Sequence, residues 1–122
     1  MTRILLVEDE ELLRTSLTSL LHRAGFDVRA ARTTAEALQA QRTFAPDVLV
    51  TDWLLQGEGD GDGIALARQL RQTTPALGVI LITGLLASAT RPEIEQGGLV
   101  AAVLEKPFLF ADLLAAIRRI SA

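Results

Sequence analysis

The stretch "DVLVTDWLL" at residues 47–55 decides how this chain folds and where its chemistry lies. Val48, Leu49 and Val50 form a continuous apolar run, which is typical of a strand covered on both faces of a parallel sheet. Asp52 stands at the end of this run, and Trp53 follows it. A carboxylate is almost never fully buried without a partner, because losing its hydration is costly. The position of Asp52 therefore predicts a cation or a reaction at the end of this strand.

Length and composition limit the classes of protein to consider. The 122 residues suit one domain, and 49% hydrophobic with 22% charged residues indicates a globular chain. The net charge of −3 argues against direct binding of nucleic acid, and the lack of cysteine excludes disulfides and thiolate chemistry. The most apolar stretch, 77–89, is shorter than the roughly 18 residues of a membrane span, and no signal peptide is recognisable. We expect a cytoplasmic protein without a membrane partner.

Apolar runs of strand length alternate with segments of helical periodicity along the whole chain. Strands are predicted at 3–7, 27–31, 47–51, 78–83 and 101–105, and helices at 10–24, 34–43, 64–72, 92–96 and 110–120. In the first helix, Leu13, Leu17, Leu20 and Ala24 are predicted to form the inward stripe. Strict alternation of strand and helix predicts an α/β fold with a parallel sheet and helices on both faces, in one domain over 1–122.

Polar side chains occur where four of the five predicted strands end. Glu8 and Asp9 follow the first strand, Asp52 ends the third, Thr83 ends the fourth and Lys106 follows the fifth. Ligands of open α/β sheets bind at the carboxyl ends of the strands. Three carboxylates gathered there repel one another unless a hard cation intervenes, and Mg²⁺ suits a water-accessible site with oxygen ligands. Asp52 can then attack phosphorus to form an acyl phosphate, with Lys106 and Thr83 holding phosphoryl oxygens.

This constellation resembles the response regulator receiver domain of two-component signalling. The motifs are "VEDEE" at 7–11, "VTDWLL" at 50–55, "LITG" at 81–84 and "LEKPF" at 104–108, so that the resemblance covers the whole chain. It implies a doubly wound, flavodoxin-like (CheY-like) three-layer sandwich with five parallel strands in the order 2-1-3-4-5. It also implies a signalling phosphoacceptor that catalyses only its own phosphorylation and dephosphorylation. A histidine kinase would supply the phosphoryl group to Asp52, the backbone carbonyl of Leu54 would be a further metal ligand, and the Lys106–Pro107 peptide would be cis.

The loop after Asp52 departs from the family pattern. It contains no proline, and the expected glycine arrives late, as Gly63 in "GEGDGDG" at 57–63. Glu58, Asp60, Asp62 and Gly63 superficially match the start of a calcium-binding EF-hand loop. The position of the bidentate glutamate is Gln69, however, and no helix precedes the loop. An acidic loop without calcium is the preferred interpretation.

Two further departures concern output and the lifetime of the phosphorylated state. Val103 occupies a position that is usually aromatic in the family, so it cannot act as the usual rotamer switch. We expect phosphorylation to draw Thr83 inward and the readout to use the loops or a short fourth helix. Leu54 and Leu85 are apolar where the family's attacking water passes, which predicts slow autodephosphorylation.

Two rival functions remain at this point. A phosphatase of the haloacid dehalogenase type needs a second aspartate two residues after the nucleophile, where this chain has Leu54. A receiver-like module that only binds partners is disfavoured because all the site residues are present.

The expected partners follow from the resemblance. They are a sensor histidine kinase or phosphotransfer protein, recognised through the first helix near Leu12, Arg14 and Thr15, and a downstream protein target. We expect a monomer or weak homodimer, either standing alone or fused to a kinase or output domain.

Overall fold

The computed structural model describes residues 1–53, 62–84 and 97–121. Five parallel strands form one sheet in the order β2-β1-β3-β4-β5, which confirms the predicted α/β topology. The strands are β1 (Arg3–Val7), β2 (Asp27–Ala31), β3 (Val48–Asp52), β4 (Gly78–Thr83) and β5 (Ala102–Glu105). The helices in the described part of the chain are α1 (Glu11–Arg23), α2 (Thr34–Gln41), α3 (Gly63–Thr73) and α5 (Phe110–Ser121).

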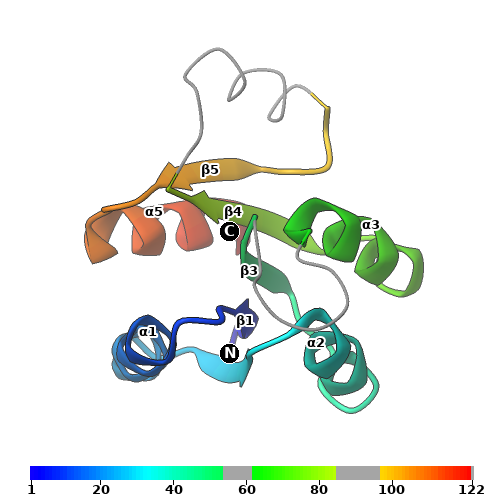
Figure 1. Ribbon diagram of the computed structural model, residues 1–122, viewed down its shortest axis with the longest axis horizontal. Helices are drawn as coiled ribbons and strands as arrows, with labels where there is room; N and C mark the ends of the chain where they lie inside the picture. The colour runs from blue at the N-terminus through cyan, green and yellow to red at the C-terminus, as the bar shows by residue number, and fades with distance from the viewer. Residues whose placement is uncertain (54–61, 85–96, 122) are drawn as a thin grey trace.

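The sheet is the middle of three layers (Figure 1). Helices α1 and α5 cover one face and α2 and α3 cover the other. Successive strand residues point to opposite faces, so Leu49 packs toward α2 and α3 while Val48 and Val50 pack toward α1 and α5. The central strand β3 is consequently buried along its whole length, as its apolar run predicts.

The inward face of α1 differs from the prediction in one respect. Leu17 and Leu21 are the buried residues of this helix, whereas Leu20, predicted to point inward, is 37% exposed. Leu17 and Leu21 are separated by four residues and share one face, which sets the rotation of the helix on the sheet. Leu20 is thereby turned to the border of that face.

Side-chain caps define the starts of two helices. Thr33 Oγ1 accepts a hydrogen bond from the Glu36 amide at the start of α2. Asp62 Oδ1 accepts from the amides of Ile64 and Ala65 at the start of α3. Asp62 therefore serves as the N-cap of α3.

Some predictions fall outside the described residues. The short helix at 92–96 is one of them, and Leu54, Glu58, Asp60 and Leu85 also lie there. Among the described helices, none has the length and apolar character needed to cross a membrane.

Candidate functional site

Three carboxylates meet at the carboxyl end of the sheet. Glu8 and Asp9 directly follow β1, and Asp52 is the last residue of the neighbouring strand β3. One carboxylate oxygen from each of the three lies within 4.8 Å of the others. The fold therefore brings together the acids that the strand-end pattern predicted.

Lys106 joins this cluster from the far edge of the sheet. Its Nζ lies 3.1 Å from Glu8 Oε1 and 3.1 Å from Asp52 Oδ2. The Lys106 amide donates a 2.8 Å hydrogen bond to the Thr83 carbonyl, which ties the residue to the end of β4. The Lys106–Pro107 peptide is cis, which confirms the expectation from the family resemblance. One ammonium group thus bridges two acids that come from different strands.

Glu8 is the most deeply buried member of the cluster. The residue is only 1% exposed, and its amide donates to the Ala31 carbonyl at 3.0 Å. Its Oε2 accepts a 3.0 Å hydrogen bond from the Glu10 amide, while Oε1 accepts from Lys106. Burial raises the pKa of Glu8, and the nearby charge of Asp52 acts in the same direction. The hydrogen bonds from the Glu10 amide and Lys106 oppose this shift, but its net direction is upward.

Asp52 and Lys106 show the same competition between burial and pairing. Burial raises the pKa of Asp52, and although Lys106 opposes this shift, the net direction is upward. Burial by itself would lower the pKa of Lys106, but hydrogen bonds to Asp52 and Glu8 outweigh it and raise the pKa. The ammonium of Lys106 is consequently held in its charged form beside Asp52.

The backbone around Asp52 is held by residues whose part in the site the sequence did not reveal. The buried Thr51 hydroxyl donates a 2.9 Å hydrogen bond to the Asp52 carbonyl. The Gly63 amide donates to the Trp53 carbonyl at 2.7 Å, and a Cβ at position 63 would collide with the Asp52 carbonyl oxygen. Gly63 therefore permits α3 to pack directly on the end of β3. The late glycine of the sequence was the available signal for this contact.

Thr83 is the last residue of β4, on the strand between Asp52 and Lys106. It is 3% exposed, and its backbone register partner in β5 is Glu105. The register also pairs Asp52 with Ile82, so Thr83 lies one residue beyond Asp52 toward the carboxyl end of the sheet. Val103 is 1% exposed and belongs to the apolar cluster on the α2 and α3 face.

The donor set fits a hard divalent cation. Three carboxylates face a single ammonium in the described cluster, which leaves an excess of negative charge. Oxygen ligands of this kind suit Mg²⁺ or Ca²⁺ and not the softer metals that prefer nitrogen or sulfur.

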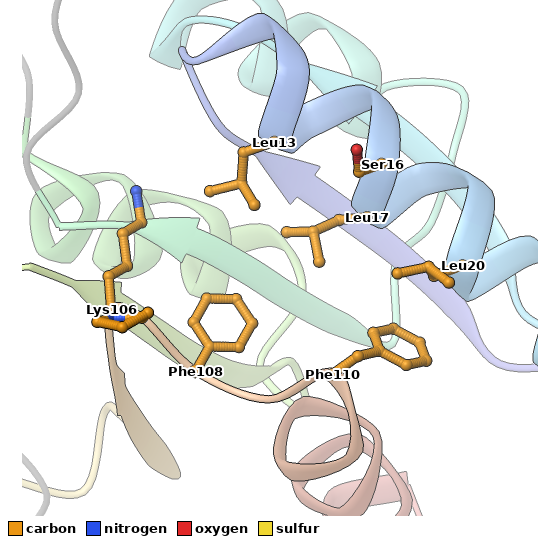
Figure 2. Close-up of a pocket in the computed structure, with 8 residues that line it drawn as sticks. Leu13, Ser16, Leu17, Leu20, Lys106, Phe108 and Phe110 are labelled. Carbon is orange, nitrogen blue, oxygen red and sulfur yellow. The ribbon is translucent and has the colours of Figure 1, made fainter.

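An apolar groove begins beside Lys106 and runs between α1 and the start of α5. Figure 2 shows Leu13, Leu17 and Leu20 of α1 facing the aromatic rings that follow β5. The groove is lined by Leu13, Ser16, Leu17, Leu20, Lys106, Pro107, Phe108 and Phe110. The exposed position of Leu20 is thus part of a continuous apolar surface next to the acidic cluster.

Comparisons with known proteins agree with this geometry. The sequence profile of the response regulator receiver domain matches residues 4–118. The response regulator receiver protein CpdR of Brucella abortus is 34% identical over 119 residues, which are 98% of this chain and 96% of CpdR. The KDP operon transcriptional regulatory protein KdpE of Escherichia coli is 36% identical over 118 residues, 97% of this chain and 50% of KdpE. This chain therefore spans about half the length of KdpE.

A solved structure extends the likeness to three dimensions. The response regulator TrrA of Thermotoga maritima, determined in complex with Mg(2+)-BeF, has a TM-score of 0.80 and 25% identity. The match covers 98% of this chain and 99% of TrrA. From the profile, the relatives and the shared sheet order, we conclude that this chain belongs to the response regulator receiver domains of two-component signalling.

Proposed function

We propose that Asp52 receives a phosphoryl group from the phosphohistidine of a sensor histidine kinase or phosphotransfer protein. The observation that carries this proposal is the placement of Asp52, with Lys106 Nζ at 3.1 Å and the acids Glu8 and Asp9 beside it. In the transfer, the donor's N–P bond breaks as one Asp52 carboxylate oxygen forms the new O–P bond. The product is an aspartyl phosphate, and the reaction is a single covalent step for this chain.

Glu8, Asp9 and Asp52 would hold Mg²⁺, together with the backbone carbonyl of Leu54 as the resemblance implies. The bound ion would neutralise the gathered carboxylates and the charge on the phosphoryl oxygens. Lys106 would donate to a second phosphoryl oxygen after releasing part of its contact with Asp52, and the Thr83 hydroxyl would donate to a third. The chain's own contribution is positioning and charge, since phosphoryl transfer requires little else from the protein.

Labelling by a small phosphodonor tests this proposal directly. Incubation with acetyl phosphate and Mg²⁺ should add one phosphoryl group to the intact protein by mass spectrometry, and EDTA should prevent it. Asp52→Asn should abolish the adduct, whereas Asp47→Asn, at the other end of β3, should leave it unchanged. Lack of an adduct on the wild-type protein would favour a receiver-like module that only binds partners.

We further propose that the phosphorylated state is long-lived. Apolar residues at positions 54 and 85 would hinder the water that attacks the aspartyl phosphate. Leu54→Asn should therefore shorten the lifetime of the adduct after the donor is removed, as followed by intact mass over time. An unchanged decay rate would contradict this explanation of slow dephosphorylation.

The partner surface is proposed to include the groove between α1 and α5. Because the groove begins at Lys106, a protein seated on it could bring its phosphohistidine to Asp52. Leu20→Asp should reduce labelling by a histidine kinase domain that phosphorylates the wild-type protein, and should leave labelling by acetyl phosphate unchanged. Equal labelling of Leu20→Asp and the wild type by that kinase domain would show that the groove is not part of the interface.

We also propose that residues 1–122 act as one receiver unit in the cytoplasm. A downstream protein, or an output domain such as the one expected from the greater length of KdpE, would read its phosphorylation.

A further inference from the structure

We infer that Arg14 is a positioning residue that holds the loop between β1 and α1 in its metal-binding conformation. This inference rests on the proposed metal site and assigns it a further determinant. The Arg14 guanidinium Nη1 lies 3.0 Å from the Glu8 carbonyl oxygen and 3.4 Å from the Asp9 carbonyl oxygen. One side chain thus contacts the backbone of both acids that follow β1.

The start of α1 is tied to the preceding loop through Arg14 and not through a side-chain cap. Glu10 occupies the N-cap position of this helix, and its side chain makes no capping hydrogen bond. The Arg14 amide donates to the Glu10 carbonyl at 2.9 Å, so Arg14 is anchored within the first turn of the helix. Its side chain then extends back over the loop and is partly buried. Arg14 thereby fastens the loop to α1 by donating to loop carbonyls.

The same loop is held on its other side by the cluster itself. Lys106 contacts Glu8 Oε1, and the Glu10 amide contacts Glu8 Oε2. These bonds orient the Glu8 carboxylate, whereas Arg14 orients the peptide groups from which the Glu8 and Asp9 side chains project. Arg14 was expected near the partner surface, and in this structure its guanidinium contacts the backbone of the site loop.

If Arg14 is a positioning residue, its removal should change the affinity for Mg²⁺ in the direction opposite to the one that its charge alone predicts. Removing a positive charge near an acidic site should strengthen the binding of Mg²⁺ if charge alone mattered. If Arg14 positions the loop, its removal should weaken binding instead. Loss of a residue that orients metal ligands typically lowers affinity by tenfold or more. The sign of the change therefore separates the two roles.

The test is an Mg²⁺ titration followed by the fluorescence of Trp53, which directly follows Asp52. Arg14→Met should weaken apparent Mg²⁺ affinity by about tenfold. Arg14→Lys should recover part of it, because an ammonium keeps the charge and can donate to a carbonyl, but a lysine side chain does not reproduce the position of Nη1 on the planar guanidinium. Arg23→Met removes the same charge from an exposed position of α1 and should leave the affinity nearly unchanged. If Arg14→Met does not fold, the comparison of Arg14→Lys with the wild type decides the inference.

A second measurement reports on the loop without metal. Hydrogen exchange of the Glu10 amide, which donates to Glu8 Oε2, should be faster in Arg14→Met than in the wild type without Mg²⁺. Unchanged or tighter Mg²⁺ binding by Arg14→Met, or equal weakening by Arg23→Met, would overturn the role of Arg14. Failure of the wild-type protein to bind Mg²⁺ or to be labelled at Asp52 would instead contradict the proposed function.

Discussion

Strand β3 has an aspartate next to each of its ends, and the two aspartates have opposite surroundings. Asp47, just before the strand, is exposed, and its Oδ2 accepts a 2.8 Å hydrogen bond from the Arg3 amide. Its own amide and carbonyl bond to Arg3 and Gly78, so it links the amino ends of three strands. Asp52, at the carboxyl end, is 8% exposed and faces two other acids and one ammonium.

The contrast shows how one residue type links strands at one end of β3 and belongs to a desolvated charged cluster at the other. A backbone amide satisfies Asp47 and fastens the sheet, while water screens its charge. Asp52 is desolvated among like charges, so the folded protein retains an unfavourable interaction that a bound cation would relieve. Asp52 should therefore lower the free energy of unfolding of the metal-free protein, whereas Asp47 should raise it. This difference between the two ends of β3 can be measured.

The largest expected effect comes from removing the ammonium that distinguishes the carboxyl end. Lys106→Met should slow labelling by acetyl phosphate at saturating Mg²⁺ by roughly 100-fold, because one preorganised donor to the transferring group is lost. Arg3→Met removes a positive charge at the amino end of β1 and is the matched control, with an expected rate close to wild type. Similar rates for Lys106→Met and the wild type would show that the contact with Asp52 is merely structural.

Thermal unfolding of matched alanine variants should give effects of opposite sign. Without Mg²⁺, Asp52→Ala should raise the free energy of unfolding by about 1 kcal/mol, since a buried acid is removed from beside two others. Asp47→Ala should lower it by about 1 kcal/mol, since the Arg3 amide loses its acceptor. Saturating Mg²⁺ should stabilise the wild-type protein much more than Asp52→Ala. If Asp52→Ala and Asp47→Ala are both less stable than the wild type without Mg²⁺, the proposed contrast between the two ends of β3 is wrong.

The smallest expected effect is the pH dependence of the difference in stability between Asp52→Ala and the wild-type protein. Burial raises the pKa of Glu8 and of Asp52, so between their ordinary values and the raised ones the folded chain binds more protons than the unfolded chain. The cost of the buried acids is thus full above the raised values and disappears as the pH falls toward the ordinary range near about 4. The difference in Tm between Asp52→Ala and the wild type, measured without Mg²⁺, should shrink as the pH is lowered toward this ordinary range. A difference that grows over this range would contradict the raised values.

Much of the fold was predictable because its strands are continuous apolar runs. The run at 78–83 is β4 without change, and the acid after the run at 47–51 is the last residue of β3. The carboxyl ends of parallel strands share one edge, so the sequence alone predicts that Glu8, Asp52 and Lys106 meet there. The strand order followed from the family resemblance.

The amino-acid sequence by itself determined which residues are available for chemistry and at which end of the sheet they lie, because the period of two and the parallel topology are local and regular. Only the tertiary structure decided how those residues are held. The rotation of α1 exposed Leu20, the approach of α3 required Gly63, and the reach of Arg14 fastened the loop after β1. Each of these depends on distances between elements that are far apart in the sequence or that turn back on one another, and periodicity along a chain does not encode such distances.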